Sequence, residues 1–188
     1  FDPKTAIQVV RERGLAMEKA AEGVESAMMA ILGLEREPLL DICVGCDGYV
    51  SIANYNCPGQ LVIAGEKKAV EEAGQKALDH GARRAVPLNT SGPFHTLLLK
   101  DASTRLHEVF KDVTFHEMNV PVIFNCTGKE LEDCSVQEML EKQVMSPVYF
   151  EDSIRTMINN GVDTIIEIGP GKVLSGFVRK IDRKIKTY

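Results

Sequence analysis

The fold of this chain is decided by residues 49–64, which read YVSIANYNCPGQLVIA. Two runs within it, 49–54 and 60–64, are rich in the apolar and β-branched residues that favour strands. Between them, the four residues Asn56-Cys57-Pro58-Gly59 include Asn, Pro and Gly, the types that favour tight turns. We therefore predict two neighbouring strands joined by a short turn.

The segments on either side of this pair alternate between helix and strand patterns. Before it, residues 27–34 form an apolar run suited to a buried strand, and residues 38–43 read as a short helix. After it come an amphipathic helix at 66–80, closed by Gly81, and a strand at 83–88. Strand, helix, strand, strand, helix, strand is the order of a ferredoxin-like unit. We predict such an α+β subdomain over residues 26–89.

The flanking regions read as a different, larger domain. The predicted order is a helix at 4–21 before the subdomain, then a helix at 97–110, a strand at 120–125, helices at 136–144 and 150–159, a strand at 164–168 and a helix at 173–180. Strands that alternate with helices are typical of a parallel sheet. We expect residues 1–25 and 90–188 to be parts of one large α/β domain.

Composition narrows the classes of function. The 188 residues carry a net charge of −5, which argues against a general nucleic-acid binder. Five cysteines without a framework spacing favour a reducing cytoplasm. Cys43-x-x-Cys46 has no second ligand pair, so we expect no metal. No apolar run is long enough to span a membrane, and no signal peptide is visible.

The candidate for chemistry is His95 in the stretch Ser91-Gly92-Pro93-Phe94-His95-Thr96. Proline forces the chain to turn between a predicted strand and a predicted helix. A histidine on such a turn is well placed to exchange protons with a substrate, although a lone histidine can equally be structural. The chain contains no G-x-S-x-G elbow that would carry a nucleophile.

Three further features each leave two interpretations open. Arg11 and Arg13 lie two residues apart on a predicted helix, so only one of them can face a pocket, where its guanidinium would suit a carboxylate. Residues 54–60 are either a plain hairpin turn or a loop whose amides line a polar pocket. Residues 167–172 are either a tight turn or an anion site at a helix start.

Taken together, the motifs resemble one family, the malonyl-CoA:acyl carrier protein transacylases and the related acyltransferase domains of polyketide synthases. The resemblance runs in family order through the whole chain. It rests on the segments VRERGLAM (10–17), AMMAILGL (27–34), ANYNCPGQ (53–60), PFH (93–95), Gln143 with Pro147-Val148, and IGPGKVL (168–174).

The resemblance implies specific roles. In the family, a serine in a Gly-His-Ser-Leu-Gly elbow becomes acylated and a histidine serves as its base, a position that corresponds to His95. Arg13 corresponds to the arginine that binds the malonyl carboxylate, and Gln143 to the residue whose backbone carbonyl orients the histidine. Asn56 would lie beside the site and Met17 would line the acyl pocket. The implied fold is an α/β-hydrolase-like domain with an inserted ferredoxin-like subdomain.

The resemblance also implies a substrate. Phe94, the bulkier choice before the histidine, resembles the relatives that select malonyl over methylmalonyl. The implied function is transfer of a malonyl group from malonyl-CoA to acyl carrier protein in fatty-acid or polyketide synthesis, by a monomer without a cofactor. The family's serine elbow would lie upstream of Phe1, so we expect this chain to lack the nucleophile and the sheet to be incomplete. We also expect the isolated chain to be marginally stable or to aggregate.

Two alternatives remain. The chain could be a non-catalytic fragment or relative that binds acyl carrier protein through a basic tail formed by Arg179, Lys180, Arg183, Lys184 and Lys186. An RNA-binding role for the ferredoxin-like unit is opposed by the acidic charge and by the lack of paired aromatic residues on its strands.

Overall fold

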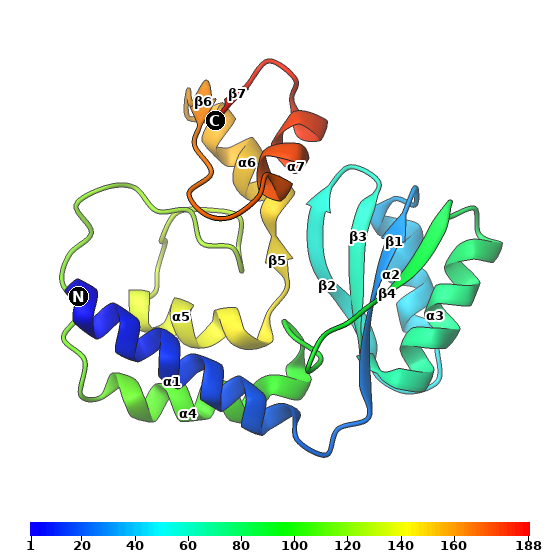
Figure 1. Ribbon diagram of the computed structural model, residues 1–188, viewed down its shortest axis with the longest axis horizontal. Helices are drawn as coiled ribbons and strands as arrows, with labels where there is room; N and C mark the ends of the chain where they lie inside the picture. The colour runs from blue at the N-terminus through cyan, green and yellow to red at the C-terminus, as the bar shows by residue number, and fades with distance from the viewer.

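The computed structural model describes residues 1–188, and in it a sheet with its own helices lies beside a separate layer of helices (Figure 1). The elements are α1 (Pro3–Ala21), β1 (Ser26–Leu32), α2 (Arg36–Val44), β2 (Val50–Cys57), β3 (Gln60–Glu66), α3 (Lys67–Asp79), β4 (Arg84–Leu88), the 3₁₀ helix η1 (Leu97–Leu99), α4 (Lys100–Phe110), α5 (Val136–Met145), β5 (Val148–Tyr149), α6 (Phe150–Asn159), β6 (Thr164–Ile165), α7 (Val173–Ile181) and β7 (Lys186–Thr187).

The main sheet has the order β4-β1-β3-β2-β5. The three pairs among its first four strands are antiparallel, and the predicted pair 49–54 and 60–64 is confirmed as β2 and β3. Their connection is tighter than predicted, because β2 continues to Cys57 and only Pro58 and Gly59 lie between the strands. Gly59 has a φ of +67°, which glycine adopts without a steric penalty.

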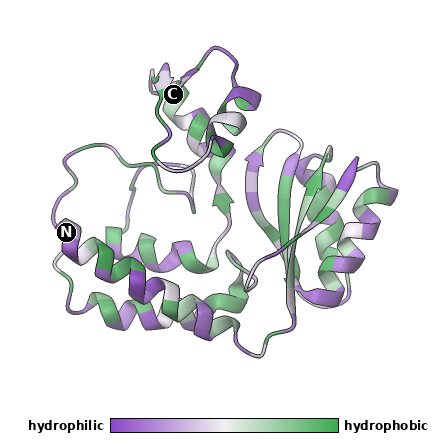
Figure 2. Ribbon diagram, in the orientation of Figure 1, coloured by the Kyte–Doolittle hydropathy of each residue, from purple (hydrophilic) through white to green (hydrophobic).

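Helices α2 and α3 pack on one face of this sheet. The core between them and the strands includes fully buried aliphatic side chains from both helices and from β1, β2 and β3, among them Ile31, Leu39, Ile52, Ile63 and Val70. Figure 2 shows apolar residues along the central strands, whereas polar residues predominate on the outward side of α3. Burial of these aliphatic groups is the main force that holds this half of the molecule together.

The second half comprises a packing of α1, α4 and α5 and a smaller group formed by β5, α6, α7, β6 and β7, which has its own core of Ile154, Val178 and Ile185. Pro3 occupies the first turn of α1, and the Asp2 carboxylate accepts hydrogen bonds from the N–H groups of Lys4 and Thr5, so the predicted helix start is confirmed. The core between α1, α4 and α5 consists of Val9, Ala16, Ala21, Leu99, Ala102, Leu106, Phe110 and Val144.

The two halves are joined through β2. The short strand β5 pairs with β2 in parallel, with Asn54 opposite Val148 and Tyr55 opposite Tyr149. The two tyrosine rings stack at a centroid distance of 4.8 Å. Arg36 of α2 lies over the Tyr55 ring and donates to Asp152 of α6 at 3.0 Å. The register of this junction is therefore fixed by backbone pairing, aromatic stacking and an ion pair together.

One predicted strand is wrong and another is shorter than predicted. Residues 120–125 are not a strand, and only an isolated bridge joins Phe124 to Lys129. The strand predicted at 164–168 is only Thr164–Ile165, which pairs in parallel with β7. The side chains of Val120, Val122, Ile166 and Ile168 are exposed. Their alternating pattern is typical of strands, but no neighbouring strand of this chain pairs with them.

The expected parallel sheet is therefore largely absent from these residues. Parallel pairing is confined to β2 with β5 and β6 with β7, so the fold is a mixed α/β structure with parallel and antiparallel pairing. The predicted helix at 97–110 begins with the 3₁₀ turn η1 before the regular helix α4. None of the helices combines the length and the apolar character needed to cross a membrane.

Replacement of Arg36 tests the junction between the halves. The guanidinium lies 3.2 Å from the Glu151 carboxylate, whose side chain is only 10% exposed, and 2.9 Å from that of Asp152. Arg36→Ala would remove the cation from Asp152 and leave Glu151 with the half-exposed Arg155 as its partner, so we expect urea unfolding to give a free energy of unfolding lower by about 1 to 2 kcal/mol.

Arg105→Ala is the matched control for this measurement. Arg105 is 59% exposed and lies 3.6 Å from Glu12, so its loss should change the free energy of unfolding by less than about 0.5 kcal/mol. Equal effects of the two substitutions would contradict a special role for the Arg36 junction.

Candidate functional site

His95 lies on a strained turn between β4 and η1. Its φ of +62° makes it the only non-glycine residue of the chain in the left-handed region. Such a conformation costs free energy in most side-chain contexts and persists where surrounding contacts enforce it. One such contact is internal to the turn, where the buried Thr96 hydroxyl donates to the Pro93 carbonyl at 2.6 Å.

The imidazole of His95 is held by the end of α5. Its Nδ1 lies 3.1 Å from the backbone carbonyl oxygen of Gln143. A carbonyl oxygen only accepts, so Nδ1 carries the proton and Nε2 is left with a free lone pair. The structure thus brings together the two residues that the resemblance assigns to the catalytic pair, and it leaves Nε2 in the form that a general base requires.

Burial sets the proton affinity of this imidazole. It lowers the pKa of His95, and the positive charge of Arg13 lowers it further. The carbonyls of Gln143 and Ser146 at the C-terminal end of α5 act in the opposite direction. The net effect is a pKa below the ordinary value, so the neutral form predominates at pH 7.

Arg13 lies close enough to His95 for its charge to lower the pKa of the histidine, whereas its neighbour Arg11 faces water. The Arg11 side chain is 70% exposed and pairs with Glu12. Arg13 is half-buried and takes part in none of the ion pairs of the chain. Burial without a compensating carboxylate lowers the pKa of its guanidinium. An unpaired, partly desolvated guanidinium beside a histidine is suited to bind an anionic group of a ligand.

Met17, on the same helix as Arg13, and Phe94, the residue before His95, are apolar side chains of the helical half. Both are half-buried and pack against the core of α1, α4 and α5. Phe94 also packs against the sheet face formed by Met28, Ala53, Val62 and Ala64, so it contacts both halves of the molecule. The residue before the histidine therefore fills the space between the sheet and the helices.

Asn56 lies near the end of β2 and is half-buried. Its neighbour Asn54 pairs with Val62, which belongs to the sheet face that Phe94 packs against. Asn56 follows two residues later and makes no side-chain hydrogen bond with His95, Arg13 or Gln143. The loop predicted at 54–60 is thus mainly strand, with a two-residue turn at its tip.

The glycine-rich segment near the C-terminus is a turn. Gly169 and Gly171 both have positive φ angles, of 149° and 91°. The Glu167 carboxylate accepts hydrogen bonds from the N–H groups of Leu174 and Ser175, at 3.2 and 2.8 Å. Because the chain's own carboxylate occupies the start of α7, the alternative of an anion site there is wrong.

The structure contains no disulfide and no cluster of side chains that could bind a metal ion. All five cysteines are free thiols, and no three His, Cys, Asp or Glu side chains are grouped as metal ligands. Burial raises the pKa of Cys43 to about 12, so the C-x-x-C pair lacks the reactive thiolate of redox motifs.

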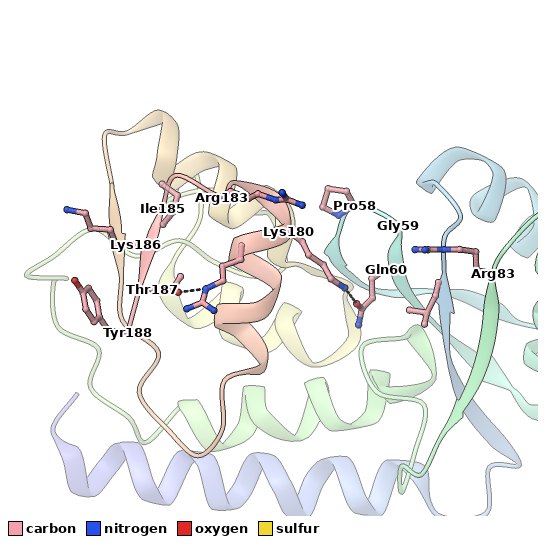
Figure 3. Close-up of a pocket in the computed structure, with 12 residues that line it drawn as sticks. Pro58, Gly59, Gln60, Arg83, Lys180, Arg183, Ile185, Lys186, Thr187 and Tyr188 are labelled. Carbon is pink, nitrogen blue, oxygen red and sulfur yellow. Dashed lines mark hydrogen bonds between the residues drawn. The ribbon is translucent and has the colours of Figure 1, made fainter.

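A basic groove of about 880 Å³ lies between α7, the C-terminal residues and the turn between β2 and β3 (Figure 3). Lys180 donates to Gln60 at 2.9 Å across it. No acidic residue lines the groove, and five cationic residues do: Arg83, Arg179, Lys180, Arg183 and Lys186. Sequence analysis named the four from the tail and missed Arg83, which only the fold brings to them; Lys184, also named, does not line the groove.

Comparison with known proteins gives consistent relatives, although no family model matches the chain. The malonyl CoA-acyl carrier protein transacylase of Bacillus subtilis (strain 168) is 47% identical over 98% of this chain and 59% of its own length. The crystal structure of the malonyl CoA-acyl carrier protein transacylase from Clostridium perfringens has a TM-score of 0.92 and 40% identity, covering 96% of this chain and 58% of that one.

A third relative is a malonyl-transacylase solved in complex with a holo type II PKS acyl-carrier protein. It has a TM-score of 0.94 and 36% identity, covering 100% of this chain and 62% of its own. The chain thus spans about three-fifths of the length of the relatives it matches.

The electrostatics of His95 can be measured by titrating its ring signals in NMR spectra. We expect a pKa below about 6.5, the ordinary value, because burial and Arg13 both disfavour the imidazolium. Arg13→Gln should raise this pKa, whereas Arg11→Gln should leave it unchanged because Arg11 faces water. A His95 pKa above 6.5, or equal shifts in the two variants, would contradict this arrangement.

Protonation of His95 should also affect folding. Since the folded pKa lies below the unfolded one, the unfolded chain takes up the proton first. This contribution therefore lowers stability as pH falls below about 6.5 and vanishes above that pH.

Proposed function

Because these 188 residues belong to the malonyl CoA-acyl carrier protein transacylase family, we propose that they carry the base and the carboxylate-binding arginine of a malonyl transferase. The single observation that carries this proposal is the half-buried pair of His95 and Gln143 near the unpaired guanidinium of Arg13. The reaction moves a malonyl group from malonyl-CoA to the thiol of an acyl carrier protein.

The proposed mechanism uses a serine from a segment outside these residues. His95 Nε2 accepts the serine proton as the serine oxygen attacks the thioester carbonyl of malonyl-CoA. The C–S bond then breaks, and the departing sulfur of CoA takes the proton from the imidazolium. In the second half, His95 accepts the proton of the carrier thiol, which attacks the seryl ester, and the serine leaves with that proton restored. The neutral Nε2 of His95 supports this role.

Arg13 is proposed to select the substrate. Its guanidinium lacks a carboxylate partner within the chain, and the free carboxylate of a malonyl group would supply one bidentately. An acetyl group would leave the guanidinium half-buried and unpaired. We propose that Met17 and Phe94 line the acyl pocket, where the ring of Phe94 limits the space for a branched acyl group, and that Asn56 lies beside it.

We propose the following division of the chain. The β4-β1-β3-β2 order with antiparallel pairing supports a ferredoxin-like subdomain at 26–89. Residues 1–25 and 90–188 would belong to an α/β-hydrolase-like domain. The exposed Val120, Val122, Ile166 and Ile168 support this assignment, because strands from the serine-bearing segment would pair beside them and bury them.

The basic groove is proposed to receive the acyl carrier protein. Its cationic side chains would complement an acidic partner, and one relative was solved in complex with a carrier protein. Because the groove does not include His95, it also supports the alternative that these residues act only as a carrier-binding module. We further propose a monomer without a cofactor, in a compartment that keeps its five thiols reduced.

The main proposal is tested by measuring malonyl transfer. The protein to use is one that contains both these residues and the serine segment. We expect intact-mass spectra to show one added malonyl group after mixing with malonyl-CoA. Arg13→Gln should lower kcat/KM for malonyl-CoA on the order of 100-fold with little change for acetyl-CoA, because only malonyl engages the guanidinium. Arg11→Gln is the matched control and should behave like the parent.

Two outcomes would contradict parts of the proposed function. Equal losses for malonyl and acetyl in Arg13→Gln would exclude carboxylate recognition by Arg13. A protein that gains no malonyl group but binds the carrier would favour the alternative of a non-catalytic binding module.

Charge reversal in the groove tests carrier binding. Lys180→Glu and Arg183→Glu should each weaken binding of an acidic carrier protein about tenfold, because an attraction becomes a repulsion at the interface. Lys68→Glu, at an exposed position on α3 outside the groove, is the control. Calorimetric titration at two salt concentrations should show weaker binding at the higher one, and an equal effect of all three reversals would contradict docking in this groove.

A further inference from the structure

Tyr49 reaches from the sheet to the turn that carries His95. It directly precedes β2, and its hydroxyl oxygen lies 3.1 Å from the backbone N–H of Leu97, which donates to it. The same hydroxyl is 3.2 Å from Oγ of Ser51. Since the oxygen accepts from Leu97, its proton is free to be donated to Ser51. This chain of hydrogen bonds ends two residues from the imidazole.

The N–H of Leu97 has no other partner in the chain. It is the first amide of η1, where backbone donors lack partners within the helix. The usual acceptor at a helix start is the side chain of the N-cap residue, here Thr96, but Thr96 makes no capping hydrogen bond and its hydroxyl instead donates to the Pro93 carbonyl. Tyr49 therefore replaces a local cap with a group from the other half of the molecule.

The position of Tyr49 is itself fixed by the sheet. Its carbonyl accepts from the N–H of Glu66 at 2.8 Å. Gly65 packs so closely that an added Cβ would collide with the Tyr49 carbonyl and with Val50. The phenol thus projects from backbone that cannot shift without disturbing β2 and β3, so it is a rigid reference point for the turn.

We propose that Tyr49 is a positioning residue for His95, because its hydroxyl anchors the start of η1 and so holds the left-handed backbone of the histidine in place. The inference rests on the proposed function of His95 as the base. Gln143 holds the imidazole from the helical side, and Tyr49 holds the backbone from the sheet side. The base is therefore placed only when both halves are docked.

Tyr49→Phe tests this inference, because it removes the hydroxyl and keeps the ring. In the protein that carries these residues with the serine segment, we expect the single-turnover rate of malonyl transfer to fall about tenfold with KM for malonyl-CoA unchanged. Water would gain access to the loosened imidazole, so the NMR pKa of His95 should rise toward about 6.5. The acid limb of the pH–rate profile should move in the same direction.

Two further variants make the result decisive. Leu97→Ala removes a side chain that is 63% exposed but keeps the N–H, so it should match the parent. Ser51→Ala removes the partner that orients the Tyr49 hydroxyl. It should therefore lower the rate and raise the His95 pKa, each by less than Tyr49→Phe does. Should Tyr49→Phe fail to fold, Ser51→Ala decides. An unchanged rate and an unchanged His95 pKa in the folded variants would overturn the positioning role.

His95→Asn separates this inference from the function on which it rests. If His95→Asn transfers malonyl normally, His95 is not the base and the proposed function fails. If His95→Asn is inactive while Tyr49→Phe and Ser51→Ala match the parent, the proposed function stands and only the positioning role of Tyr49 fails.

Discussion

Strand β2 is hydrogen-bonded on both edges, antiparallel to β3 on one side and parallel to β5 on the other, and the geometry around His95 depends on this double pairing. Tyr49, at its start, contacts the turn after His95. Further along, the pairing with β5 fixes the segment that follows α5, and α5 carries the carbonyl of Gln143. Both attachments of the histidine therefore lead back to one strand.

The electrostatic field at the site couples the charges of Arg13 and His95. Arg13 and His95 are both partly buried, and the charge of the arginine lowers the pKa of the histidine. A carboxylate bound to Arg13 would cancel part of that field. The imidazole would then become a stronger base when an acidic ligand is present than when the pocket holds only water. A substrate of this kind would raise the basicity of the group that acts on it.

Local sequence patterns predicted most of the helices and strands, but they did not predict the parts of the fold that depend on residues distant in sequence. The strands and helices of 26–89 were predictable because each apolar face is covered by a neighbour close in sequence. The strand at 120–125 was predicted wrongly because its alternation has no pairing partner in this chain. The choice between Arg11 and Arg13 was open, since spacing does not say which side of a helix is buried. Arg83 and Tyr49 carry no local signal, because their roles arise from contacts across 48 to about 100 residues of sequence.

The left-handed backbone at His95 limits which residues can take its place. Besides glycine, asparagine and aspartate are the side chains that tolerate this conformation best, whereas valine and isoleucine are strongly disfavoured there. With the proposed role of His95 as a base, the position would be under two separate requirements, one for a basic ring nitrogen and one for a permissive backbone. If a descendant of this chain no longer needed the base, only the second requirement would remain. Substitutions at this position would then favour Asn, Asp or Gly. A preference for these three residue types would identify the ancestral site after its chemistry had been lost.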